Sequence, residues 1–499
     1  MDVRSGGLLR LNTFRFRRWL VSRLGTRKPL QRRTKLVLAS LIFLLSWSTK
    51  SLQAVDLAPL IYTDAQPFGG LTSGYDERAV GITNGEGLLG PYDIEPSRTK
   101  SLSEAPGYAI YLSAIYSVIG RNFFKVQLTQ NLLNSLSPVL IFLIAGWVVA
   151  WRVGIIAGIL AALSHHLSHI SNFILPDSLT ALPLLGSIYV LLLARRFRRW
   201  SYWLYALAGA LIGLSSWLRP QAMLAGIVFA VVLAMITPRR RADLKRPLVM
   251  ALVSLLCIAP ITVRNYIVYR EFVPISIGVG LNLWEGIGDY SGDRFGAVAE
   301  DHRVAEQEAV LYDNPQYRES WAYPDGISRD RARIRKSFAV IVRHPLWYAG
   351  VMLNRMGEMV KYSAHAPLVF RSTDTRLLQQ DAQIRRQWRD IASPPGSLGF
   401  AESMSWMRLP IRGLQRTAKE TALLFILLGV AIMFVGSWRR SLFLLMTPLY
   451  YLLFQSAMHT EFRYTLPMHY FLFVFAAIVW VLIGASVGGW VKGLAGRAK

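Results

Sequence analysis

Apolar runs of about 20 residues recur along this chain, and they limit its possible folds more than any other feature. A helix of that length crosses the hydrocarbon core of a bilayer. Over the 499 residues, 53% are hydrophobic and the mean hydropathy is +0.32. Trp, Tyr and Phe are plentiful, as in the aromatic belts of membrane proteins. The sequence therefore predicts an all-α, polytopic bundle of about 10 transmembrane helices.

The predicted transmembrane architecture also explains the formal net charge of +26. Its basic residues cluster at the ends of apolar segments, which is typical of cytoplasmic loops. No recognised nucleic-acid-binding motif accompanies the charge, so we expect no nucleic-acid partner. The one cysteine, Cys257, excludes an intramolecular disulfide and any CxxC site.

Four regions follow from the apolar runs and charges. Residues 1–35 form a basic cytoplasmic segment, and 36–266 form an N-terminal transmembrane module that includes an outer loop, 63–120. Residues 267–414 form an outer-face region, and 415–499 hold the last transmembrane helices and a short cytoplasmic tail. We interpret the first apolar run as an uncleaved signal anchor; cleavage near Ala54 is the alternative.

The distribution of Lys and Arg sets the orientation of the expected spans. The apolar segment 106–120 is too short to cross readily, so we expect a helix in the outer interface. If it crossed, the basic stretch "RRFRRW" would lie outside. The expected spans are 36–62, 124–150, 153–172, 177–194, 201–217, 221–237, 247–266, 419–437, 441–458 and 464–488.

This topology brings several ionisable residues to one face of the membrane, where such groups commonly mark a site or a mutual pair. Asp76 and Glu77 lie in the first outer loop, and Asp177 begins the span 177–194. A carboxylate there can act as a base toward a hydroxyl. The alternatives are an N-cap for Asp177 and first-turn helix electrostatics for the Asp76–Glu77 pair.

Basic residues and histidines reach the same face. Arg219 and Arg463 can each complement a phosphate, or can instead pair with a neighbouring acid. His165 and His169 share one helical face, which is half of a possible zinc site. No partner motif such as HExxH is present, so no metal is assigned and a divalent ion is left open.

Several motifs, in order, resemble those of GT-C glycosyltransferases, especially protein O-mannosyltransferase-like (family 39) enzymes and the aminoarabinose transferases of lipid A. They are "YDERAVGITNGEG", "EAPGYAIYLSAIYSVIG", "NFILPDSLTALPLL", "WLRPQAMLAG", "APITVRNYIVYREFVPISIGVGLNLWEGIGD" and "HTEFRYTLPMHYFLF". The resemblance covers roughly residues 36–488. It implies transfer of a sugar from a polyprenyl-phosphate donor to a lipid, glycan or protein hydroxyl, with inversion.

Carried over by position, the resemblance implies that Asp76 is the catalytic carboxylate, with Glu77 beside it, and that Asp177 orients a substrate. Tyr108 would shape the lipid–sugar cavity, and Arg463 would meet the donor phosphate. One departure concerns the Lys that precedes the Pro pair in the aminoarabinose transferases. Glu104-Ala105 stands there in this chain, and the candidate substitutes are Lys100, Arg219 and Arg264.

Two other functions remain open at this point. A flippase or transporter of lipid-linked sugars would show inverted repeats and acids at the midplane, and neither feature is found. An oligosaccharide ligase or polymerase would use a diphosphate donor. The expected location is a bacterial inner (plasma) membrane, with the site facing the periplasm.

Overall fold

A computed structural model gives the structure of the chain and describes residues 23–24, 30–61, 69–237, 241–360 and 405–497. Within these ranges the regular structure is entirely helical, which confirms the predicted all-α class. The basic segment 1–35 is therefore described only in part, and residues 361–404 lie outside the described ranges.

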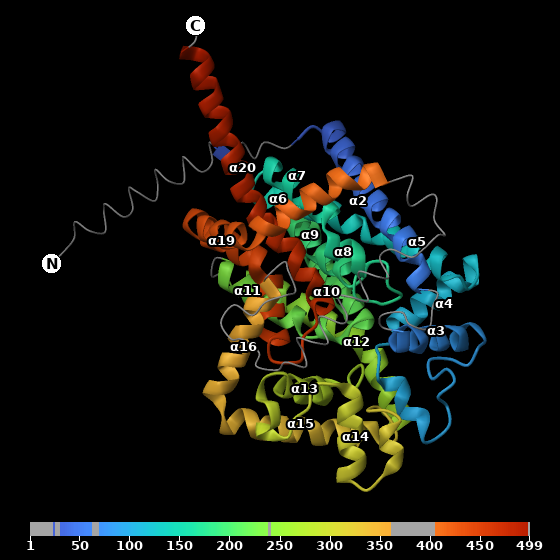
Figure 1. Cartoon of the computed structure of the whole chain (residues 1–499). Helices are drawn as coiled ribbons and strands as arrows, with labels where there is room; N and C mark the ends of the chain where they lie inside the picture. The colour runs from blue at the N-terminus through green and yellow to red at the C-terminus, as the bar shows by residue number, and fades with distance from the viewer. Residues whose placement is uncertain (1–22, 25–29, 62–68, 238–240, 361–404, 498–499) are drawn as a thin grey trace, which may run out of the picture.

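Most of the apolar runs form the helices of one bundle (Figure 1). These helices are α2 (Arg32–Ile61), α5 (Phe123–Asn134), α6 (Leu136–Val148), α7 (Trp151–Leu163), α8 (His165–Ile170), α9 (Ala181–Arg196), α10 (Ser201–Leu218), α11 (Ala225–Ile236), α12 (Arg241–Tyr269), α19 (Ser405–Gln455) and α20 (Leu466–Arg497).

Five stretches of the described chain are long and apolar enough to cross a membrane, which supports an integral, multi-pass protein. They are Arg32–Val55, Phe123–Val148, Leu244–Tyr269, Ala422–Gln455 and Phe462–Gly488. The count of about 10 spans stays a prediction. Helix α19 has a kink at Ser437, where the sequence predicts a boundary between two spans.

The core lies where α6, α7, α9, α10 and α20 pack together. Helix α20 contributes a nearly unbroken buried surface, including Phe471 and Phe475, because residues all round this helix are apolar. Figure 1 shows α20 running from the middle of the molecule to the C-terminus. The last helix of the chain is therefore a central part of the bundle core.

The segments between these helices add further helices: α3 (Gly69–Thr83), α4 (Gly107–Ile119), α13 (Val279–Ser291), α14 (Asp301–Leu311), α15 (Gly326–Arg343) and α16 (Pro345–Val360). The short helix predicted for 106–120 is α4, which packs against α3. Helix α15 ends at Arg343, and the fixed φ of proline suits Pro345 to the first turn of α16.

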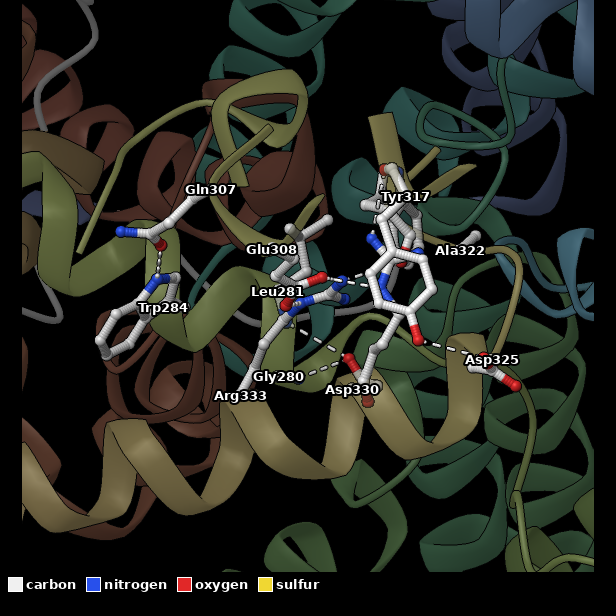
Figure 2. Close-up of polar contacts among 12 residues, drawn as sticks. Gly280, Leu281, Trp284, Gln307, Glu308, Tyr317, Ala322, Asp325, Asp330 and Arg333 are labelled. Atoms are coloured by element: carbon white, nitrogen blue, oxygen red, sulfur yellow. Dashed lines mark hydrogen bonds and ion pairs between the residues drawn. The ribbon is translucent and has the colours of Figure 1, made fainter. Parts of the chain in front are cut away.

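Buried ion pairs hold α13, α14 and α15 together (Figure 2). Glu308 of α14 accepts hydrogen bonds from Arg329 and Arg333 of α15 at 2.7 Å. Asp330 of α15 accepts from the backbone N–H groups of Gly280 and Leu281. These groups lie in the first turn of α13 and have no partner within that helix. The helices α13, α14 and α15 therefore form a packed layer.

An irregular segment, 171–180, interrupts the bundle between α8 and α9 and is buried throughout. Its backbone is paired by polar side chains on one face of α5. Gln127 donates to the carbonyl of Asn172, and Gln130 donates to those of Ser171 and Phe173, at 2.7–2.9 Å. Non-helical backbone at membrane depth is tolerated only when it is satisfied in this way.

Asn131 of α5 extends this network. Its amide donates to the Asn172 side chain at 2.7 Å, and its oxygen accepts from the Ser171 hydroxyl at 2.9 Å. All three residues are buried. Replacing Asn131 by leucine would leave both partners without these bonds.

We therefore expect Asn131→Leu to destabilise the protein by about 1–3 kcal/mol for each buried group left unpaired. The measurement is thermal unfolding of the purified protein in detergent. Leu132, on the exposed face of the same helix, provides the matched control, and Leu132→Ala should unfold close to the wild-type temperature. Equal losses in the two variants would contradict this role for Asn131.

Candidate functional site

Asp76 lies within α3, and its side chain is fixed by two groups from the region of α4. The Tyr116 hydroxyl donates to Oδ1 at 2.6 Å. The Arg121 guanidinium donates to Oδ1 at 3.2 Å and to Oδ2 at 2.5 Å, a bidentate pair. The carboxylate is 6% exposed, whereas the Arg121 side chain is 60% exposed. The arginine can therefore move into solvent without disturbing the core.

Glu77 points elsewhere. Successive residues on a helix diverge by about 100°, and Glu77 accepts from the Tyr92 hydroxyl at 2.6 Å on the exposed side of α3. The alternative of first-turn electrostatics for Asp76 and Glu77 is wrong, because α3 begins at Gly69, two turns earlier. The two neighbouring acids thus have different surroundings.

Asp177 lies in the buried segment 171–180 and pairs with Arg219, whose Nη2 donates to Oδ2 at 2.6 Å. Its Oδ1 is buried and makes no hydrogen bond. The N-cap alternative for Asp177 is wrong: the residue preceding α9 is Thr180, and no side chain caps that helix. A buried ion pair, and not a helix cap, accounts for this acid.

Tyr464 joins this pair to a second one. The guanidinium carbons of Arg219 and Arg463 lie 5.3 and 4.9 Å from the centre of the Tyr464 ring, within cation–π range. Arg463 donates to both oxygens of Glu461 at 2.7 Å. Residues from the middle and the end of the chain therefore form one charged assembly beside Asp177.

The face of α3 next to Asp76 approaches this assembly. Tyr75 is fully buried and packs edge-on against Tyr108 of α4, with ring centres 5.1 Å apart. Burial raises the pKa of Tyr75, and the charges of Arg219 and Asp177 also act on its hydroxyl. The Tyr108 hydroxyl donates to Gln130 of α5 at 2.8 Å. Tyr108 thus lies between α3 and the network that holds Asp177.

A cavity of about 150 Å³ is lined by residues of α3, α10 and α12 and of the segment 101–106 that precedes α4. Its polar lining includes Arg78, Glu104, Arg264 and Asn265, and Trp217 and Pro260 are among its apolar walls. The Arg78 Nε and the Arg264 Nη2 are buried and make no hydrogen bond. Unpaired guanidinium donors at a cavity are suited to an anion with several acceptor oxygens.

The remaining basic and metal candidates, Lys100, His165 and His169, are not among the residues that line this cavity. The Lys100 ammonium lies 4.6 Å from the centre of the Tyr92 ring. The rings of His165 and His169 stack with centres 5.8 Å apart, so they do share a helical face. Among the described residues, no group of three or more His, Cys, Asp or Glu is arranged to hold a metal ion.

Sequence reasoning missed four contributors: Arg121, Tyr116, Gln130 and Tyr464. The α5 face had a detectable signal, because Gln127, Gln130, Asn131 and Asn134 follow helical spacing within an otherwise apolar run. Arg121 had none, since it is one of many arginines near a helix end. Among the described residues, no hydrogen bond or ion pair links Asp76 to Asp177 directly.

Residues 103–263 match the family model described as dolichyl-phosphate-mannose-protein mannosyltransferase. This segment is less than half of the chain; it contains Tyr108, Asp177 and Arg219, and Asp76 precedes it. A comparison with the sequences of curated proteins gives no significant match.

Solved structures with a similar fold come from Archaeoglobus fulgidus. Its oligosaccharyltransferase in the apo form gives a TM-score of 0.50 and 14% identity, over 93% of this chain and 52% of that one. The same enzyme tethered to an acceptor peptide with the NVT sequon gives 0.49 and 16%, over 90% and 49%. The chain thus spans about half the length of the solved structures that it matches.

The described chain is that of an integral, multi-pass membrane protein, and its helical fold is similar to that of the archaeal oligosaccharyltransferase. The family match over residues 103–263 agrees with the resemblance to GT-C glycosyltransferases found in the sequence.

The Asp177–Arg219 pair allows a direct test of this site. Removing one member of a buried ion pair leaves an uncompensated charge and costs about 3–5 kcal/mol. We expect Asp177→Asn and Arg219→Gln each to lower the unfolding temperature, and the double variant to lose less than the sum. Additive losses in this double-mutant cycle would show that the two side chains do not interact.

Proposed function

We propose that the protein is a membrane glycosyltransferase that moves a sugar from a polyprenyl-phosphate carrier to an acceptor hydroxyl. The observation that carries this proposal is the cavity with the unpaired guanidinium nitrogens of Arg78 and Arg264, next to the helix that bears Asp76. The name of the matched family, which refers to a dolichyl-phosphate sugar and a protein acceptor, supports a carrier of this kind.

The donor phosphate is the leaving group of this reaction. It needs little protonation, because arginines stabilise the charge that develops as the glycosidic bond breaks. Arg264 and Arg78 are the best placed, since both line the cavity and each has a buried nitrogen that makes no hydrogen bond. Lys100, Arg219 and Arg463 stay candidates, although Arg219 pairs with Asp177 and Arg463 pairs with Glu461.

Asp76 is the proposed base. An ionised carboxylate is an acceptor with about four lone-pair positions, and Tyr116 and Arg121 take three of them in this structure. The remaining position, or one released when Arg121 moves into solvent, can accept the proton of the attacking hydroxyl. Attack opposite the departing phosphate inverts the anomeric centre. Asp177 would orient a substrate, and Tyr108 would line the lipid–sugar cavity.

We expect Asp76→Asn to abolish transfer, with a fall in kcat of about 100-fold or more, because the amide cannot take the proton. The assay follows release of polyprenyl phosphate by the protein in nanodiscs. Asp93→Asn, an exposed acid in the same outer loop, is the matched control and should retain activity. Normal turnover by a folded Asp76→Asn protein would remove Asp76 as the base.

The acceptor can be a lipid, a glycan or a protein, and mass spectrometry of envelope glycolipids and glycoproteins with and without the protein distinguishes them. A radiolabelled polyprenyl-phosphate sugar that crosses the bilayer without release of polyprenyl phosphate would instead indicate a transporter. Activity with a diphosphate donor alone would indicate a ligase or polymerase.

We further propose that the chain crosses the membrane about ten times, in a bacterial inner membrane, with Asp76 on the periplasmic side. In a Cys257→Ser background, Ser73→Cys and Arg199→Cys introduce thiols at exposed positions in α3 and between α9 and α10. A membrane-impermeant maleimide added to whole spheroplasts should label position 73 and should reach 199 only after lysis. Labelling of both positions before lysis would overturn the orientation.

A further inference from the structure

Glu104 places a negative charge in the same cavity that offers unpaired guanidinium donors. Its side chain is 12% exposed and lines the cavity together with Arg78 and Arg264. Its Oε2 lies 3.7 Å from the Arg78 Nη1 and makes no hydrogen bond. Its backbone carbonyl accepts from the same Arg78 Nη1 at 3.2 Å. The carboxylate is therefore close to the arginine without the short bonds of a full ion pair.

The local structure makes room for this carboxylate. A Cβ on Gly74 of α3 would come within 3.1 Å of the Glu104 Oε1. A larger residue at that position would push the side chain out of place. Glu104 is thus held against α3, next to Gly74 and Arg78.

Several charged or titratable groups act on Glu104, and they come from every neighbouring element. Arg78, Glu77 and Tyr75 belong to α3. Tyr92 lies in the loop after α3, and Lys100 comes four residues before Glu104 in the chain. Arg219 begins the turn after α10, and Arg264 belongs to α12. Burial raises the pKa of the Glu104 carboxyl to about 6, against the lowering effect of the Arg78, Arg219 and Lys100 charges.

We propose that Glu104 is the proton-linked counter-charge of an anion site in this cavity, and that an incoming phosphodiester replaces its negative charge. This inference rests on the proposed function, because it takes the donor phosphate as the natural anion. When Glu104 is ionised, it repels the phosphate and partly neutralises Arg78. When it is protonated, its hydroxyl can donate a hydrogen bond to a phosphate oxygen.

The sign of the pH dependence follows from these two states. Below pH about 6 the carboxyl is neutral and the anion binds tightly; above it, binding requires uptake of a proton and weakens. A phosphodiester keeps a single negative charge over this range, so the change in affinity comes from the protein. A phosphate monoester is a poorer probe, because its own second pKa is about 6.

The test uses farnesyl methyl phosphate, a phosphodiester without a sugar, and the full chain in nanodiscs. We expect its Kd to rise by about tenfold between pH 5 and pH 8, the effect of one titrating charge. In Glu104→Gln the Kd should match the low-pH wild-type value at both pH values. The matched control is Glu86→Gln, an exposed glutamate of the same loop, which should keep the wild-type dependence.

A wild-type Kd that is equal at both pH values, or an undiminished dependence in Glu104→Gln, would overturn the inference. Absence of binding to the wild-type protein would overturn it as well, because no anion site would exist. The pH dependence of the wild-type Kd tests the inference even if Glu104→Gln does not fold. Arg264→Gln should weaken binding at both pH values. Transfer activity, measured separately with the sugar donor, shows whether the proposed function stands when this inference fails.

Discussion

The hydrogen bonds between the α5 side chains and the backbone of segment 171–180 are the interaction on which the site depends. Non-helical backbone inside an apolar bundle is costly unless its polar groups are paired. Gln130 pairs two of these carbonyls and also accepts from the Tyr108 hydroxyl. The segment that bears Asp177 and the helix that bears Tyr108 are therefore fixed by the same amide, so a change at Gln130 would disturb both.

Electrostatic pairing then divides the ionisable groups into two kinds. Asp177 and Glu461 are each held by an arginine at 2.6–2.7 Å, and Tyr464 lies between the two guanidinium groups. Such pairs fix distant parts of the chain relative to one another. Arg78 and Arg264 instead line the cavity, and each has a buried nitrogen there that makes no hydrogen bond. Because an unsatisfied buried donor is costly, these two nitrogens mark the place where a ligand would gain most.

Local sequence patterns predicted most helices, but they did not predict where α3 and α9, the helices next to Asp76 and Asp177, begin. The short helix 107–119 followed from the length of its apolar segment. The start of α3 was missed because "GGLTSGYDERAVGIT" opens with glycines and has no charged first turn. The N-cap role of Asp177 failed because the buried segment extends to Thr180, held by bonds from α5 that no local rule anticipates.

The sequence by itself determined the membrane class, the helical periods and the set of acids worth testing, because apolar length and charge bias are local properties. Only the tertiary structure decided which arginine meets which acid. The chain has 56 basic residues, and nothing local singles out Arg121 for Asp76 or Arg219 for Asp177. Ion pairing depends on distances of a few ångströms between groups far apart in sequence, and packing of the helices sets those distances.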